Sequence, residues 1–292
     1  MTTWGTRARR VGAGAAGLAV VAGAWEGYKA LGPDAGVTIG GTVVLPRTTD
    51  MAMPHLTDMI ARFGEPARGA TGDTVGQVVL DASLFTLGLA AMGWLAAVVL
   101  GLALAVLMTR SRLAESAVLP WVVLSQTVPL IAIAPLVRRW GSQIQIGSFE
   151  WTNEYSVAVI AAYLAFFPIA VGALRGLKSP EQTHLDLLRT YGVGWWRTLV
   201  TLRLPASVPY LLSSLRLAAA AAVIGAVVAE VSIGLRGGIG RLVVEYAQSA
   251  SGDPARSWAP IFGAIAVGLV AAAFVGLLGL LATPYRRQEV SA

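Results

Sequence analysis

Residues 84–108 read LFTLGLAAMGWLAAVVLGLALAVLM, a run of apolar and small residues without a charged side chain. A helix rises about 1.5 Å per residue, so this run can cross a hydrocarbon core about 30 Å thick. The whole chain has the same character, with 55% hydrophobic and 13% charged residues among 292 and a mean hydropathy of +0.66. Such a composition leaves too little polar surface to cover a soluble globule. The sequence therefore predicts an integral membrane protein.

Further apolar runs of membrane length surround this one. The alternating pattern of a β-barrel is absent, and lipid offers no partner for open backbone groups, so we expect helices. The predicted spans are 84–108, 117–137, 155–174, 206–229 and 258–283, with a weaker span at 11–30. The predicted fold class is an all-α polytopic membrane protein with about six transmembrane helices.

The first apolar segment has two possible roles. Arg7, Arg9 and Arg10, followed by an apolar stretch and Ala22-Gly23-Ala24, also fit a cleavable secretory signal. We expect an uncleaved span, because the rest of the chain is itself a membrane protein and needs no separate export signal. Glu26, near its outer end, is expected to be interfacial.

The distribution of Lys and Arg predicts the orientation, because cytoplasmic connections carry the excess. With both termini inside, the inner segments hold most of these residues: Arg7, Arg9, Arg10, Arg110, Arg112, Arg175, Lys178, Arg189, Arg197, Arg203, Arg286 and Arg287. The outer segments hold Arg47, Arg62, Arg68, Arg138, Arg139, Arg236, Arg241 and Arg256. Arg138 and Arg139 are the main exception to this rule, since they fall in an outer segment. We keep the orientation because the reverse one would place the basic segment 175–203 outside.

Several kinds of chemistry are not expected from this sequence. It contains no cysteine, and its two histidines, His55 and His184, fall on opposite sides of the predicted membrane, so we expect no metal site. No phosphate-binding loop and no nucleophile with its base can be recognised. The glycine-rich segment 234–240 lies on the outer side, where ATP is not available, and is interpreted as a bend. We therefore predict no catalytic residue and no cofactor.

Two polar segments interrupt the spans. The outer segment 31–79 contains Leu56, Met59, Ile60 and Phe63 at helical spacing, which predicts a short amphipathic helix at the outer interface. The longer interruption after the fourth span, 180–205, reads PEQTHLDLLRTYGVGWWRTLVTLRLP.

The segment 180–205 has the signals of two helices. Pro180 can open the first helix and Gly192 can end it. A second short helix is expected from Gly194, until Leu204-Pro205 stops it and starts the next span. Two functions remain open from the residues alone, namely a cytosolic docking element and an interfacial anchor of Trp and Arg.

The same segment resembles the EAA loop of ATP-binding cassette importer permeases. That pattern is Glu-Ala-Ala, three residues, Gly, nine residues, then an aliphatic residue, any residue, Leu and Pro. The matching positions here are Asp186, Leu187, Leu188, Gly192, Leu202, Leu204 and Pro205. Asp replaces Glu, and two leucines replace the alanines and are expected to enlarge the buried face. The resemblance implies a type I importer fold in which this loop couples to a cytosolic ATPase.

The resemblance covers nearly the whole chain. It is closest to permeases for nitrate, sulfonates, taurine and thiamine-pathway pyrimidines. Its further marks are Leu45-Pro46, 126–135, Phe166-Phe167-Pro168 and the stretch from Ser214-Leu215-Arg216 to Ala229-Glu230. The segment 141–154 departs from it, being longer and more polar than expected; it is either an elaboration near the dock of the binding protein or an exposed hairpin without a role.

Charges and breaks within the spans predict a translocation path. Gln126, Pro129 and Pro135 interrupt the third span, and proline frees carbonyl groups that can line a cavity. Arg216 and Glu230 are ionisable residues in the fifth span, which makes them functional candidates. For Arg216, bracing of neighbouring helices is the alternative. Small residues along 218–229 are consistent with a dimer interface.

These observations define one expected protein. It is a non-catalytic permease of the cytoplasmic membrane, working as a homodimer or with a similar permease, together with two cytosolic ATPases and an external solute-binding protein. Its parts are 1–30, 31–79 and the core 80–292 with its coupling loop at 180–205. The solute is either a sulfonate-, nitrate- or taurine-like anion or a pyrimidine or vitamin precursor. The alternative function is a secondary transporter or channel that needs no ATPase.

Overall fold

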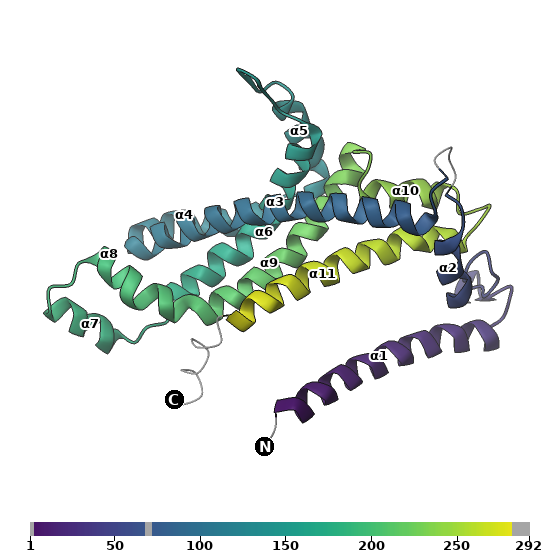
Figure 1. Cartoon of the computed structure of the whole chain (residues 1–292), viewed down its shortest axis with the longest axis horizontal. Coiled ribbons are helices and arrows are strands. Elements are labelled where there is room, and N and C mark those ends of the chain that lie inside the picture. Colours follow the sequence, from purple (N-terminus) through teal and green to yellow (C-terminus); the bar gives the residue numbers. More distant parts are fainter. Residues whose placement is uncertain (1–2, 68–71, 282–292) are drawn as a thin grey trace. The chain divides into compact units, whose positions relative to one another are not determined.

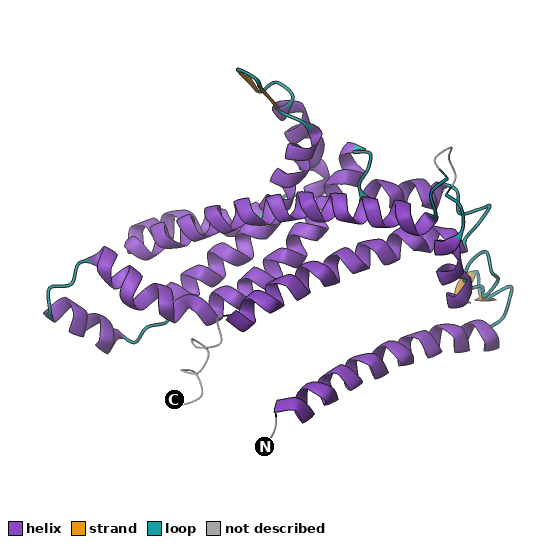
Figure 2. Cartoon of the chain, in the orientation of Figure 1, coloured by secondary structure: helices purple, strands orange, loops and turns teal. Residues whose placement is uncertain are grey.

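The computed structural model describes residues 3–67 and 72–281, and helices dominate this part of the chain (Figure 2). The chain forms two compact units: unit 1 comprises Met1–Val79 and Glu245–Phe262, and unit 2 comprises Leu80–Val244 and Gly263–Ala292. Arg68, Arg286, Arg287 and the end of the last predicted span, Thr283, lie outside the described residues.

Four helical stretches of the described chain are long and apolar enough to cross a membrane: Val75–Arg110 (α3), Asn153–Leu177 (α6), Trp195–Ile233 and Ala255–Gly279. A bent pair, Arg112–Ser125 (α4) and Leu130–Gly141 (α5), forms a fifth if it is counted as one span. The weak first span corresponds to α1, Thr3–Leu31, which is not among these helices. The predicted class is confirmed, and the predicted number of six is approximate.

Unit 2 is centred on α6 and α9 (Leu204–Ile233), which pack against each other more extensively than any other pair of described helices. Alanines with almost no exposed area line this contact: Ala161, Ala165, Ala218, Ala222, Ala226 and Ala229. Small side chains allow such close approach. The buried residues of 218–229, predicted to serve a dimer interface, therefore pack within the protomer. Residues of α3 and of α11 (Ala259–Leu281) complete this core.

The predicted continuous span 117–137 is wrong in one respect: α4 and α5 meet at an angle of 102°. The predicted interruption is present, because α4 ends at Ser125 and Pro129 precedes α5. Pro129 has no N–H to donate to the Ser125 carbonyl four residues earlier. The hydroxyl of Tyr163 on α6 donates to that carbonyl instead, so the break is stabilised by a neighbouring helix. Figure 1 shows α5 turning away from the bundle.

The end of the 180–205 segment also differs from the prediction. Helix α8 (Trp195–Thr198) does not stop at Leu204-Pro205 but continues through a π-helical turn, Leu199–Arg203, into α9. Pro205 cannot donate a backbone hydrogen bond, and the wider turn directly before it accommodates this loss. The loop and the fifth predicted span are consequently one helical piece.

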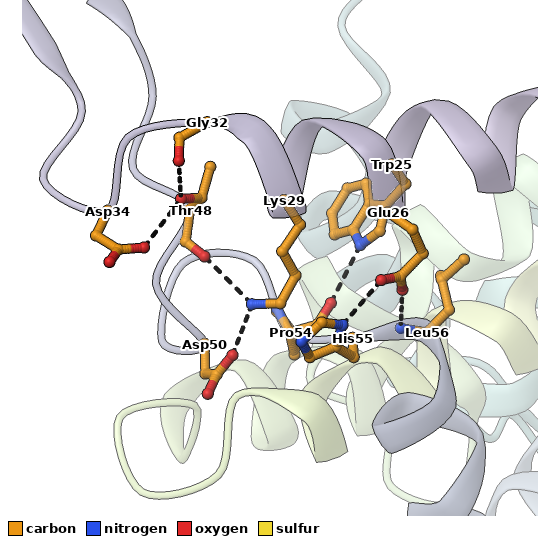
Figure 3. A network of polar contacts seen from close by, with 10 residues as sticks. All are labelled: Trp25, Glu26, Lys29, Gly32, Asp34, Thr48, Asp50, Pro54, His55 and Leu56. Atoms are coloured by element: carbon orange, nitrogen blue, oxygen red, sulfur yellow. Dashed lines mark hydrogen bonds and ion pairs between the residues drawn. The ribbon is translucent and has the colours of Figure 1, made fainter.

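Unit 1 is held together by the last turns of α1. Figure 3 shows side chains of these turns in polar contact with residues between Thr48 and Leu56. Glu26 accepts hydrogen bonds from the Leu56 N–H at 2.7 Å and pairs with His55 Nδ1 at 2.8 Å. Lys29 Nζ donates to the Thr48 carbonyl at 3.2 Å and to Asp50 Oδ1 at 2.6 Å (Figure 3). Glu26, expected to be interfacial, therefore serves a structural contact.

The remainder of unit 1 contains a short helix where the amphipathic helix was predicted, α2 (Leu56–Ala61), followed by a 3-10 turn at Arg62–Gly64. Its place at the outer interface stays a prediction. Before them lies a short antiparallel hairpin of β1 (Val37–Ile39) and β2 (Thr42–Leu45). Residues 245–262 join this unit through Arg62, whose Nε donates to Asp253 Oδ1 at 3.2 Å. They include the end of α10 (Ile239–Gln248) and a 3-10 turn at Ala255–Trp258.

Candidate functional site

The loop with the importer signature begins with α7, Gln182–Thr190. Gly192 ends this helix with φ of +69°, a conformation that side chains with a Cβ atom rarely adopt. The Val193 N–H donates to the Leu188 carbonyl at 3.0 Å and closes the helix end. A Cβ atom at Gly192 would meet nothing within 4 Å. Backbone conformation, not crowding, therefore requires glycine at this position.

The acidic position of the loop is solvated. Asp186 Oδ1 accepts hydrogen bonds from Gln182 Nε2 and Arg189 Nη1, both at 2.9 Å and both within α7. Leu187 is 54% exposed and Leu188 is half-buried, as are Leu202, Leu204 and Pro205. The predicted enlargement of a buried face by Leu187 is therefore not seen within the protomer; its side chain is available to a partner.

The base of the loop is fixed to two other helices. The Arg110 guanidinium at the end of α3 lies 5.2 Å from the centre of the Trp195 ring, a cation–π contact. Arg203 Nη1 donates to the Leu177 carbonyl at 2.8 Å, which satisfies an open carbonyl at the end of α6. Lys178 forms an ion pair with Glu115 of α4. The base of the loop is thus in contact with α3, α4 and α6, and it is continuous with α9.

The path candidates fall into three separate places. Gln126, Pro129 and Pro135 lie together along the bend of α4 and α5, and all three are exposed. Arg216 is half-buried in α9, and its guanidinium lies beside Gly279 of α11. Among the described residues, its Nε atom has no hydrogen-bond partner. This location agrees with either bracing or substrate contact.

Glu230 differs from the other path candidates because it is completely buried. Its Oε1 atom accepts a hydrogen bond from Thr86 Oγ1 at 2.7 Å, and its Oε2 atom accepts one from the Gly240 N–H at 2.8 Å. Thr86 Oγ1 in turn accepts from the Ile239 N–H at 2.9 Å. The carboxylate therefore holds the start of α10 against α3 and α9.

Sequence reasoning missed three residues that the fold makes important, namely Thr86, Tyr163 and Arg110. Thr86 had a signal, since it is the only hydroxyl-bearing residue in the apolar run 84–108. Tyr163 and Arg110 had none, because their partners, Ser125 and Trp195, are brought near by packing alone.

The departing segment 141–154 forms a short hairpin of β3 (Gln145–Ile146) and β4 (Phe149–Glu150). Trp151 Nε1 donates to Ser156 Oγ of α6 at 2.8 Å, and the Trp151 ring packs on Tyr155. The tip is exposed, with Ile146 at 72%. The hairpin is thus fixed at its base and open to solvent at its tip.

Membrane-length helices, a bent pair of helices and an anchored, exposed helical loop together define a polytopic helical membrane protein. Residues 97–285 match the family described as "Binding-protein-dependent transport system inner membrane component", and the chain belongs to this family. It is therefore the non-catalytic permease subunit of an ATP-driven importer and a multi-pass inner-membrane protein. The family works with ATPase and solute-binding partners. Nothing in the comparisons favours a secondary transporter.

The chain is similar to several named permeases. It is 32% identical over 208 residues to the formylaminopyrimidine transport permease protein ThiX of Halalkalibacterium halodurans, covering 70% of this chain and 77% of ThiX. It is 35% identical over 153 residues to a probable ABC transporter permease protein of Haemophilus influenzae, covering 52% and 58%. It is 28% identical over 210 residues to the putative aliphatic sulfonates transport permease protein SsuC of Bacillus subtilis, covering 70% and 72%.

Proposed function

We propose that residues 180–205 are the element through which this permease engages its cytosolic ATPase. The observation that carries the proposal is the contrast between the exposed surface of the loop and its anchored base. Large apolar side chains are exposed on it, namely Leu187, Tyr191, Trp196 and Val200. Its base is fixed to the bundle by Arg110, Lys178 and Arg203. A loop that exposes large apolar side chains and is anchored at its base is suited to docking a partner and to transmitting force.

This assignment implies an orientation. The 180–205 loop and both termini lie in the cytoplasm, and the hairpin at 145–150 lies outside, where the solute-binding protein delivers its ligand. The basic residues of 175–203 support this orientation, because short cytoplasmic connections carry the excess of Lys and Arg.

The permease works as a pair, either with a second copy or with a similar chain, and the path lies between α5 and α9 of the two protomers. On α9, large apolar residues are exposed at intervals of two turns, at Tyr210, Leu217, Ile224 and Val231. Residues seven apart lie on one face of a helix. This face is directed away from α6 and is available to the partner.

The transported solute is a small molecule delivered by the external protein. Names of relatives point to formylaminopyrimidine and to aliphatic sulfonates, and these correspond to the two classes that the sequence leaves open, an anion and a pyrimidine or vitamin precursor.

Gly192→Val tests the coupling role. A β-branched residue is strained at φ of +69°, so α7 should lose its orientation while the membrane helices remain intact. Gly194→Ala is the matched control, since Gly194 has no positive φ and open space around its Cβ position. We expect Gly192→Val to insert in the membrane but to lose co-purification of the ATPase and solute uptake, whereas Gly194→Ala keeps both. Full uptake by Gly192→Val, or uptake without any ATPase, would contradict the proposal.

A further inference from the structure

An open cavity, lined by both polar and apolar atoms, lies in unit 2 where α5, the start of α6 and the end of α9 meet. Its volume is about 380 Å³, and its lining includes Pro135, Arg138, Arg139, Ser142, Asn153 and Ser232. This volume is within the range of about 300–1,000 Å³ that is usual for small-ligand sites. Pro135, the two arginines and Ser142 follow one another at helical intervals and so share a face at the end of α5.

The two arginines of the cavity have different roles. Arg138 Nη1 donates to the Ile233 carbonyl at 3.0 Å, which fixes this guanidinium at the end of α9. For Arg139, no side-chain hydrogen bond or ion pair is found among the residues that the structure describes. No carboxylate in that part of the chain lies within 4.0 Å of either guanidinium. The cavity therefore carries two positive charges that the protein does not neutralise.

The remaining polar groups define what the cavity can bind. The Ser142 and Ser232 hydroxyls donate to carbonyls of their own helices, Arg139 at 2.9 Å and Val228 at 2.7 Å, so these donors are occupied. The nearest acid in sequence, Glu154, accepts from Thr152 Oγ1 at 2.8 Å and does not line the cavity. The other polar groups at the cavity are the guanidinium groups, the Asn153 side chain and the positive end of α6, which begins at Asn153.

The position of the cavity indicates what these two charges could bind. Arg138 and Arg139 are the main exception to the expected distribution of basic residues, since they lie on the outer side of the membrane. They also lie on α5, one turn beyond Pro135. Helices α5 and α9 are the two helices proposed to face the path.

We propose that this cavity binds the oxyanion group of the transported solute, a sulfonate, carboxylate or phosphate, at the outer mouth of the path. The inference rests on the proposed function, which supplies the orientation and the path. A guanidinium presents several N–H donors in one plane, an arrangement that fits two oxygens of such a group. A neutral pyrimidine would offer these two exposed guanidinium groups no negatively charged oxygens. The cavity thus favours an anionic solute over the uncharged class.

The experiment uses the full-length permease in nanodiscs of phosphatidylcholine, with methanesulfonate as the probe and dimethyl sulfone as its uncharged counterpart, at constant ionic strength. Binding is measured as the ligand-dependent rise in unfolding temperature. Arg139→Gln removes the charge that has no partner, and Arg139→Lys keeps a charge without the planar donor pair. Arg236→Gln is the matched control, because Arg236 is exposed, on the proposed outer side, and outside the cavity lining.

We expect methanesulfonate, and not dimethyl sulfone, to stabilise the protein. Because a hydrogen bond to a charged group is strong, Arg139→Gln should weaken the apparent affinity about tenfold or more. Arg139→Lys should have an intermediate affinity and Arg236→Gln an unchanged one. The assignment is overturned if the wild type does not respond to methanesulfonate, if Arg139→Gln responds like the wild type, or if Arg236→Gln is weakened equally.

A second arm separates the solute from a lipid headgroup that carries the same chemistry. In nanodiscs containing phosphatidylglycerol, a response to methanesulfonate that persists supports a solute site, whereas its loss in the wild type assigns the cavity to lipid and overturns the proposal. Co-purification of the ATPase is measured on the same samples. If the ATPase remains bound while the anion response is absent, only the anion site fails; if the wild type binds no ATPase, the proposed function fails.

Discussion

Thr86 on α3 donates a 2.7 Å hydrogen bond from Oγ1 to Glu230 Oε1 on α9, across 144 positions of sequence. Neither residue has exposed area. With the N–H groups of Ile239 and Gly240 bound to the same pair, three helices meet at one buried carboxylate. A buried carboxylate is tolerated only when its hydrogen-bonding capacity is satisfied, so each member of this cluster depends on the others.

Thr86→Val should therefore destabilise the protein, because an isosteric change removes the donor to Glu230 and the acceptor for Ile239. We expect a loss of about 1–3 kcal/mol, measured by thermal unfolding in detergent. Thr86→Ser retains the hydroxyl and serves as the control, with a much smaller loss. Equal stability of Thr86→Val and wild type would show that the hydrogen bond contributes nothing.

Gly238→Ala should prevent the turn between α9 and α10 from closing. A Cβ atom at this position would lie 2.2 Å from Glu230 Cδ, and moving the carboxylate away would disturb its hydrogen bonds with Thr86 and Gly240. Overpacking of this kind costs about 1–3 kcal/mol. Gly268→Ala, a position with open space in α11, is the control and should not lower the unfolding temperature. A Gly238→Ala variant as stable as that control would contradict the close approach.

Tyr163→Phe should weaken the junction of α4 and α5 without changing the apolar surface of α6. The Ser125 carbonyl loses the hydroxyl donor that replaces the absent Pro129 N–H. The carbonyl then keeps only the long hydrogen bond from the Val128 N–H, at 3.5 Å, and losing one hydrogen bond costs about 0.5–1.5 kcal/mol. Hydrogen exchange of residues 122–134 should rise in the variant relative to wild type, while exchange in α7 stays the same. Unchanged exchange at the bend would mean that the hydroxyl does not support it.

Lys29→Met should loosen the segment 46–56 of unit 1. The Lys29 side chain is 6% exposed and reaches both the Thr48 carbonyl and Asp50; the variant keeps the apolar stem and loses the donors. Limited proteolysis should cut this segment faster than in wild type, whereas Arg47→Met, at an exposed neighbour, should leave the rate unchanged. Equal cutting rates for Lys29→Met and wild type would contradict the anchor.

The same contact predicts a pH dependence. The hydrogen bond from Lys29 lowers the pKa of Asp50 below its ordinary value. A depressed carboxyl pKa contributes stability that is present above the ordinary Asp pKa, about 4, and is lost as the pH falls through the lowered value. Proteolysis at 46–56 should therefore accelerate in acid more for wild type than for Asp50→Asn. Equal acceleration in the two proteins would exclude this linkage.

Local chemistry made much of the fold predictable. Helices α3 and α6 were expected because uninterrupted apolar runs must satisfy their backbone groups internally in lipid. The break at Pro129 and the left-handed Gly192 were expected because each follows from the covalent structure of one residue. These predictions depend on a few adjacent positions, and for that reason they did not require knowledge of the packing.

Predictions that depended on distant partners were less complete. Glu230 was expected as a path residue, but its partner Thr86 lies far away in sequence and encloses it in the core. The alanines of 218–229 were expected at a dimer interface, but α6 covers their buried face. Leu204-Pro205 was expected to end a helix, whereas a π-helical turn lets the chain continue. In each case the residue type was informative, but the sequence did not reveal the environment of the residue.

The sequence by itself determined that this chain is a helical membrane protein, because the length and apolarity of its runs can be read directly along the chain. The spacing from Asp186 to Pro205 can be read in the same way, and it carries the resemblance to importer permeases. Only the tertiary structure decided what surrounds the charged residues of the spans. It buries Glu230 among donors from α3 and α10, and it leaves Arg138 and Arg139 in a cavity without a neutralising carboxylate. The physical reason is that the free energy of a charge depends on the groups that packing places around it, and packing joins residues that are remote in sequence.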